Sequence, residues 1–150
     1  MNEPVQANLV VPGSSREEVF AALLEVERFP EWGFGLKEAR VLGAPAGGIA
    51  PGTTIEFALS ALGLTHRVSS TVTAVDPPSL IEWRYTKGAT GSGGWTLEEL
   101  GGAVKACFHT SYEVRPFWLD RLANRPFFRG VVEDLLGRSM RRLAQRLARA

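Results

Sequence analysis

The sequence FRGVVEDLLGRSMRRLAQRLAR, residues 128–149, decides the fold class of this chain. Its apolar side chains recur every three or four residues, which is the period of one face of an α-helix. These apolar positions are Phe128, Val131, Val132, Leu135, Met140, Leu143 and Leu147. The opposite face carries Arg138, Arg141, Arg142, Arg146 and Arg149. The pattern predicts an amphipathic helix of about 20 residues, or about 30 Å at 1.5 Å per residue.

A proline marks where this helix begins. Pro126 is poorly tolerated inside a helix, because it has no amide hydrogen and its ring clashes with the preceding turn. We therefore expect Asn124 to cap a new helix at this point. Residues 117–124 then form a separate turn or two.

The region from Lys37 to Val114 has the pattern of strands and turns, with no further helix-length period. The predicted strands cover residues 37–43, 52–60, 65–75, 80–87, 93–99 and 103–114. Residues rich in Gly and Pro separate them. Hairpins between sequential antiparallel strands are the economical connection at these loop lengths.

The N-terminal residues add one strand and one helix. Apolar and polar residues alternate over residues 5–11, which predicts a strand that ends at Pro12-Gly13. Ser14 and Ser15 then precede Glu17 and Glu18 by three residues, the spacing of a capping box. The helix that follows has the apolar stripe Val19, Phe20, Leu23, Leu24 and Val26. The segment 29–33 breaks it, with a second short helical turn as one outcome.

These elements predict an α+β fold within a single domain spanning residues 1–150. A sheet with one apolar face needs a cover, and the C-terminal helix is the longest element available. We expect a seven-stranded curved antiparallel sheet wrapped around that helix, with one or two short helices between the first two strands.

Charge is distributed unevenly along the chain, although the net charge is only +1. Residues 115–150 carry nine Arg and three acidic residues, against eight basic and thirteen acidic residues in 1–114. Clustered Arg can bind phosphate or another acidic partner. It is also the ordinary composition of a solvated helix face, which we favour. We expect no nucleic acid partner.

The composition also bears on cellular location. No apolar run approaches the length of about 18 residues needed to cross a bilayer, so we expect no stable membrane insertion. The N-terminus lacks the pattern of a signal peptide, and Cys107 is the single cysteine. A cytoplasmic protein without a disulfide is therefore expected.

Several short motifs, each of which records a turn or a packing position, recur here in a specific order. They are Pro12 with Glu18-Val19-Phe20, Phe29-Pro30-Glu31-Trp32, Pro51-Gly52-Thr53, Val72-Thr73-Ala74-Val75-Asp76-Pro77-Pro78, Ile81-Glu82-Trp83-Arg84 and Trp95-Thr96-Leu97. In order and spacing the chain resembles the START-like (SRPBCC) superfamily, in its polyketide cyclase/dehydrase branch. The resemblance implies the helix-grip fold, with a cavity that holds lipids, sterols or polyketides in relatives. It implies no single reaction, because the family includes carriers, sensors and cyclases.

Alternation along the strands predicts which residues would line such a cavity. The candidate ligand-binding residues are Phe57, Leu59, His66, Val68, Trp83, Tyr85, Trp95, Phe108, Tyr112, Phe128, Val132 and Leu135. A register slip of one residue would turn the strand residues among them outward. The alternative is that the same side chains fill a solid core.

Polar residues in this set would orient a ligand or move a proton. His66, Tyr85, Thr110 and Tyr112 are the candidates, although His66 also fits a satisfied histidine at a strand start. Glu56, Glu82 and Arg84 should face outward, as should Cys107 and His109, so neither a metal site nor a catalytic triad can be assembled. The glycine-rich residues 88–94 are interpreted as a flexible hairpin at the mouth of the cavity.

Three functions fit these observations. The first is binding or carrying of a small hydrophobic ligand, of aromatic, polyketide-like or lipid character, without a cofactor. The second is a cyclase or dehydratase that uses the same pocket, with catalytic residues unknown. The third is an interaction module that uses the Arg-rich helix face. A weak homodimer is left open.

Overall fold

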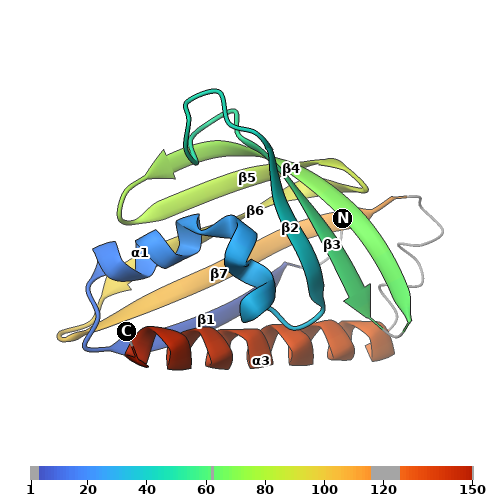
Figure 1. The fold of residues 1–150 in the computed structure, drawn as a ribbon. Helices are drawn as coiled ribbons and strands as arrows, with labels where there is room; N and C mark the ends of the chain where they lie inside the picture. The colour runs from blue at the N-terminus through green and yellow to red at the C-terminus, as the bar shows by residue number, and fades with distance from the viewer. Residues whose placement is uncertain (1–3, 62, 116–125, 150) are drawn as a thin grey trace.

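The computed structural model describes residues 4–61, 63–115 and 126–149. The elements in chain order are β1 (Val5–Pro12), α1 (Arg16–Leu24), the 3-10 helix η1 (Val26–Glu31), β2 (Leu36–Gly43), β3 (Thr54–Ala61), β4 (Leu64–Asp76), β5 (Leu80–Lys87), β6 (Ala89–Glu99), β7 (Ala103–Val114) and α3 (Pro126–Arg149). Figure 1 shows the strands forming one curved sheet, with α3 running across its open side next to β1. This is the predicted helix-grip arrangement.

The sheet is antiparallel throughout the described residues and has the strand order β1-β7-β6-β5-β4-β3-β2. Neighbouring strands are consecutive in the chain except for β1, which pairs with β7 so that Val5 faces Thr110 and Pro12 faces Ala103. β1 and β2 are therefore the two edges of the sheet. The predictions of seven strands and of sequential hairpins are confirmed.

The first helix begins with the predicted capping box. The Ser15 side chain accepts a hydrogen bond from the Glu18 amide at 3.1 Å, and the Glu18 carboxylate accepts one from the Ser15 amide at 3.2 Å. Val19, Phe20 and Leu23 are buried, so the predicted stripe faces the core. The predicted second helical turn is η1, which contains Pro30.

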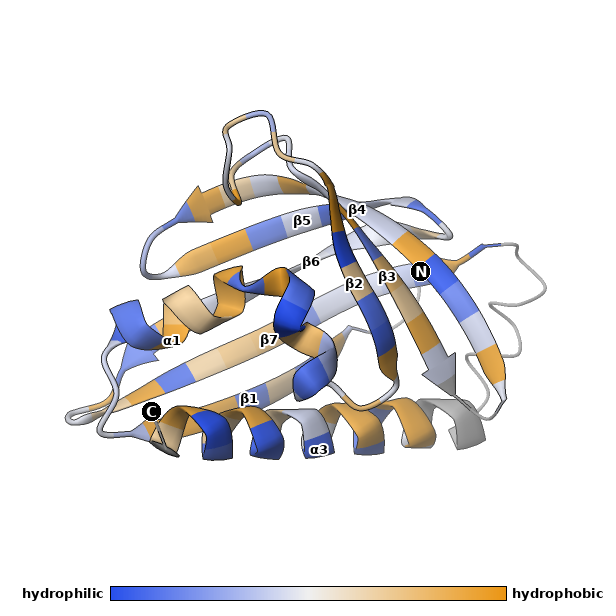
Figure 2. Ribbon diagram, in the orientation of Figure 1, coloured by the Kyte–Doolittle hydropathy of each residue, from blue (hydrophilic) through white to orange (hydrophobic). Residues whose placement is uncertain are grey.

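The C-terminal helix α3 begins at Pro126, in the first turn, where a missing amide hydrogen costs no internal hydrogen bond. It has 24 residues, which corresponds to about 36 Å and exceeds the predicted length. Hydrophobic and hydrophilic segments alternate along it (Figure 2). The predicted cap Asn124 and the turn over 117–124 lie outside the described residues. No helix in the described ranges is long and apolar enough to span a membrane.

A packed core occupies the space where α1 meets β1, β6, β7 and α3. The buried side chains of this cluster are Leu9, Val11, Val19, Phe20, Leu23, Trp32, Ile81, Trp95, Leu97, Val104, Ala106, Met140 and Leu143. The sheet is thus closed against α3 by side chains at this place. The remaining concave surface is free to enclose a cavity.

The prediction of a flexible hairpin over residues 88–94 is wrong. β6 begins at Ala89, and Gly88 alone separates it from β5. Gly93 lies opposite Trp83, and a Cβ at Gly93 would lie 2.9 Å from Nε1 of the Trp83 indole. The glycines of β6 are therefore strand residues, and Gly93 lets the Trp83 indole come close to the backbone.

Candidate functional site

A cavity of about 420 Å³ lies between the concave face of the sheet, η1 and α3. Strands β3 to β7 all contribute inward-facing side chains to it, and α3 contributes Val132, Leu135, Leu136, Ser139 and Met140. Most of these side chains are apolar or aromatic. Its size lies within the roughly 300–1,000 Å³ range of small-molecule sites.

All of the predicted ligand-binding residues except Phe128 line this cavity. They are Phe57, Leu59, His66, Val68, Trp83, Tyr85, Trp95, Phe108, Tyr112, Val132 and Leu135. The Phe128 side chain lies outside what the structure describes. The predicted alternation therefore places the inward face correctly, while a role for these residues in binding a ligand stays a prediction.

Aromatic rings form two groups on the walls of the cavity. Phe108 lies between Trp83 and Trp95, with ring centroids 5.9 Å and 5.2 Å away. Phe29 lies 4.9 Å from Trp32 and 6.3 Å from Phe57. Aromatic rings at such distances attract one another, and these contacts help to fix the positions of the rings in the cavity wall.

The segment between η1 and β2 also lines the cavity, and the sequence did not predict this. Its lining residues are Trp32, Gly33, Phe34 and Gly35, and Leu36 at the start of β2 lines the cavity next to them. A segment of loop has no period from which an inward face could be read. The Phe29-Pro30-Glu31-Trp32 motif predicts that the helix ends here. It does not predict which side chains face the cavity.

Two contacts hold this segment in place. The Phe34 amide donates a hydrogen bond to Oγ of Ser139 at 2.8 Å, and that hydroxyl donates to the Leu135 carbonyl at 2.7 Å. On the other side, the Ser60 amide donates to the Gly35 carbonyl at 2.6 Å. Phe34 is 40% exposed, as are Leu59 and Leu64 at 44% and 47%, so apolar side chains that line the cavity also reach the surface.

A pair of hydroxyl groups supplies polarity to the cavity. The Tyr85 hydroxyl lies 2.6 Å from Oγ1 of Thr110, which also donates to the Ser92 carbonyl at 3.4 Å. Burial raises the pKa of Tyr85, and hydrogen bonds with Thr110 and Trp83 oppose the rise. The phenol therefore stays neutral at physiological pH and can exchange a hydrogen bond with a bound molecule.

His66 also lines the cavity and is fixed by the backbone. Its Nε2 lies 2.8 Å from the Gly88 carbonyl oxygen, and a carbonyl can only accept, so Nε2 carries the proton. In the neutral ring Nδ1 is then an acceptor. Within the described residues Nδ1 has no hydrogen-bond partner, so His66 is a histidine satisfied at one nitrogen and available at the other.

No described Asp, Glu, Lys or Arg lines the cavity. Glu56 faces outward as predicted, and Arg40 and Arg67 lie 2.7 Å and 3.1 Å from its carboxylate. The Arg40 guanidinium lowers the pKa of Glu56. Groups of three or more His, Cys, Asp or Glu that could hold a metal ion are absent from the described part of the chain.

The Arg-rich face of α3 is partly engaged within the protein. Arg138 pairs with Asp134 at 3.1 Å, Arg146 with Glu31 at 2.9 Å, and the Arg142 guanidinium lies 5.2 Å from the Phe34 ring centroid. Such pairing agrees better with the predicted solvated helix face than with a free basic stripe.

Comparison with known proteins places the chain among relatives of the same fold. A family model described as polyketide cyclase / dehydrase and lipid transport matches residues 7–149. A comparison with curated protein sequences found no match.

Three solved structures illustrate the likeness of fold. The protein TTHA0849 from Thermus thermophilus has a TM-score of 0.79 at 14% identity, covering 97% of each chain. The Zhui aromatase/cyclase from Streptomyces sp. R1128 has a TM-score of 0.76 at 14% identity, covering 98% of this chain and 94% of that one. A START superfamily protein from Mycobacterium smegmatis has a TM-score of 0.67 at 16% identity, covering 97% and 94%. At these identities the likeness concerns the fold alone.

Proposed function

The chain belongs to the polyketide cyclase/dehydrase and lipid transport family, and we propose that it binds a small hydrophobic ligand in the cavity between the sheet and α3. The observation that carries the proposal is an apolar, aromatic-walled cavity of about 420 Å³. Water in a lining of this kind would find few hydrogen-bond partners, so an apolar occupant is favoured over water.

The lining supports a ligand whose buried part is neutral. Moving a charged group into an apolar site is unfavourable unless a partner charge meets it, and the described lining supplies none. One or two hydrogen bonds are available, from the Tyr85 and Thr110 hydroxyls and from Nδ1 of His66. Affinity would come mainly from apolar area removed from water, at about 25 cal/mol per Å².

Native mass spectrometry of the protein purified gently from its host is the direct test. We expect a retained small molecule, seen as a discrete mass increment that organic extraction removes. Calorimetric titration with the extracted molecule should then show binding that Trp83→Ala weakens about tenfold or more, because a wall aromatic is lost. Leu100→Ala is the matched control, since Leu100 is 45% exposed and lies away from the cavity. Unchanged binding in a folded Trp83→Ala variant would exclude this cavity as the site.

A second candidate function is a cyclase or dehydratase that uses the same cavity. It is supported by the family description and by two groups able to transfer a proton, His66 and Tyr85, in a mostly apolar lining. An enzyme of this kind should convert a poly-β-carbonyl substrate, and His66→Ala should abolish turnover while binding persists. A pure binding protein would show binding without turnover in both forms.

A further inference from the structure

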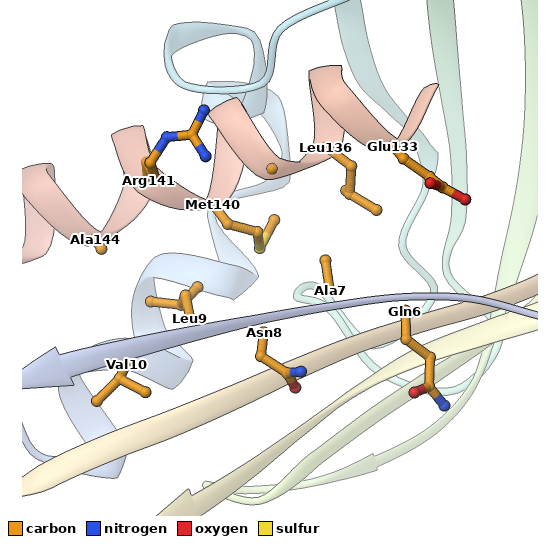
Figure 3. A pocket seen from close by; sticks show the side chains of 11 residues that line it. Gln6, Ala7, Asn8, Leu9, Val10, Glu133, Leu136, Met140, Arg141 and Ala144 are labelled. Carbon is orange, nitrogen blue, oxygen red and sulfur yellow. The ribbon is translucent and has the colours of Figure 1, made fainter. Parts of the chain in front are cut away.

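A second hollow, of about 460 Å³, lies next to the ligand cavity, between α3 and β1. In Figure 3, Leu136 and Met140 of α3 point toward Ala7 and Leu9 of β1 at its floor. Leu136 and Met140 also line the ligand cavity, so these side chains separate the two spaces. We call this hollow the β1–α3 groove.

One wall of the β1–α3 groove is an edge strand. β1 pairs with β7 on one side, and within the described residues no strand pairs with its other side. Gln6, Asn8 and Val10 are exposed, Val10 by 50%. Residues 5–11 contain no charged side chain and no proline, the usual protections of an open edge. An edge of this kind is suited to contact with another chain.

The other wall carries charges that have no partner in the described residues. Glu133 and Arg141 are both exposed and line the β1–α3 groove. Gly137 lies midway between them, so the three residues are spaced i, i+4, i+8 along one face of the helix. A Cβ at Gly137 would have only the Arg141 guanidinium within 4 Å, at 3.6 Å. The backbone at the centre of this face is therefore approached closely by the Arg141 side chain alone.

We propose that the β1–α3 groove is the interface of a homodimer, with a two-fold axis passing next to Gly137. A two-fold interface must be self-complementary. Two antiparallel α3 helices that cross at Gly137 place Glu133 of each copy at the height of Arg141 of the partner subunit, because both residues lie four positions, or about 6 Å, from the axis. Two equivalent ion pairs result.

The proposed dimer is weak. Its contacts are two exposed ion pairs, a glycine-centred helix crossing and one short strand edge, which fits a small interface. We expect a dissociation constant between about 10 µM and 1 mM, with dissociation promoted by salt.

Sedimentation equilibrium of the ligand-free full chain tests the proposal. The average mass should rise with concentration from 16.3 kDa toward twice that value. Glu133→Arg and Arg141→Glu should each weaken the dimer about tenfold or more, because each creates like-charged pairs at both ends of the interface. The double variant Glu133→Arg/Arg141→Glu should restore it, since the pairs return with opposite sign.

Arg138→Glu is the matched control, because it makes the same change of charge on α3 at a residue outside the β1–α3 groove. In this variant the dissociation constant of the dimer should stay within about twofold of the wild-type value. A wild-type chain that stays monomeric up to about 1 mM overturns the proposal. The proposal is also overturned if neither single charge reversal weakens the dimer. The same holds if the double variant does not restore it. Because no ligand is present, these outcomes are independent of the proposed binding function.

Discussion

Tyr85 on β5 and Thr110 on β7 join their hydroxyl groups at 2.6 Å across the intervening strand β6. The pair is the polar feature of a wall otherwise formed by Trp83, Trp95 and Phe108. Because a hydroxyl can both donate and accept, the pair can turn one hydrogen bond toward a ligand without leaving either oxygen unsatisfied.

Removing one member of this pair should destabilise the protein more than removing both. Thr110→Val removes the hydroxyl that lies 2.6 Å from the Tyr85 hydroxyl and leaves Tyr85 with Trp83 as its hydrogen-bond partner, so the free energy of unfolding should fall by about 1–3 kcal/mol. The double variant Tyr85→Phe/Thr110→Val removes both polar groups and should lie closer to wild type. Urea unfolding of the two single variants and the double variant measures the coupling. Additive losses would contradict a direct bond between the two side chains.

The Tyr85 hydroxyl should also distinguish ligands by polarity. We expect Tyr85→Phe to weaken binding of a carbonyl- or hydroxyl-bearing aromatic ligand by about 2–10-fold, the effect of one hydrogen bond, and to leave a hydrocarbon of the same shape unaffected. Calorimetric titration with such a matched pair measures this. Equal weakening for both ligands would mean that the variant changes the shape of the cavity.

Gly93 should not tolerate a methyl group. In Gly93→Ala the new Cβ would lie 2.9 Å from both the Trp83 Nε1 and the His109 carbonyl oxygen, so the indole must move. A loss of about 1–3 kcal/mol in unfolding free energy is expected. Gly43→Ala is the control, because nothing lies within 4 Å of its Cβ position, and it should stay within about 0.5 kcal/mol of wild type. Equal stabilities would mean that Trp83 does not cover β6.

Ser139 should control how firmly the Phe34 segment closes on α3. Ser139→Ala removes the acceptor of the Phe34 amide, so that amide should lose hydrogen-exchange protection. A bound ligand should then leave faster, because Phe34 lines the cavity and is 40% exposed. Amide exchange and stopped-flow dissociation measure the two effects. Slower dissociation would show that the segment does not lie on the exit path.

The stability of the contact between η1 and α3 should depend on pH. Arg28 and then Arg146 hold the pKa of Glu31 at about 2, below its ordinary value of 4.5. Because the folded pKa is the lower one, this stabilisation is complete above pH 4.5 and is lost as the pH falls toward about 2. In Arg146→Gln, the urea midpoint should fall less than in wild type as the pH is lowered through that window. Arg138→Gln is the control, because Arg138 pairs with Asp134 and not with Glu31, and its urea midpoint should fall with pH as in wild type.

The sequence by itself determined the order of the elements and the inward face of the strands. Alternation with a period of two is a local property, so β5 and β7 have the bounds that the pattern predicts, and inward-facing residues such as Phe57 and Phe108 line the cavity. The capping box at Ser15 and the amphipathic period of α3 are equally local.

Only the tertiary structure decided what depends on contacts between distant segments. The glycines of β6 resemble a loop in sequence, yet their backbone pairs with the neighbouring strands β5 and β7. Phe34 lines the cavity because Ser139, 105 residues later in the chain, accepts its amide hydrogen. No period within the chain carries such information, because it arises when a particular side chain from one element meets the backbone of another.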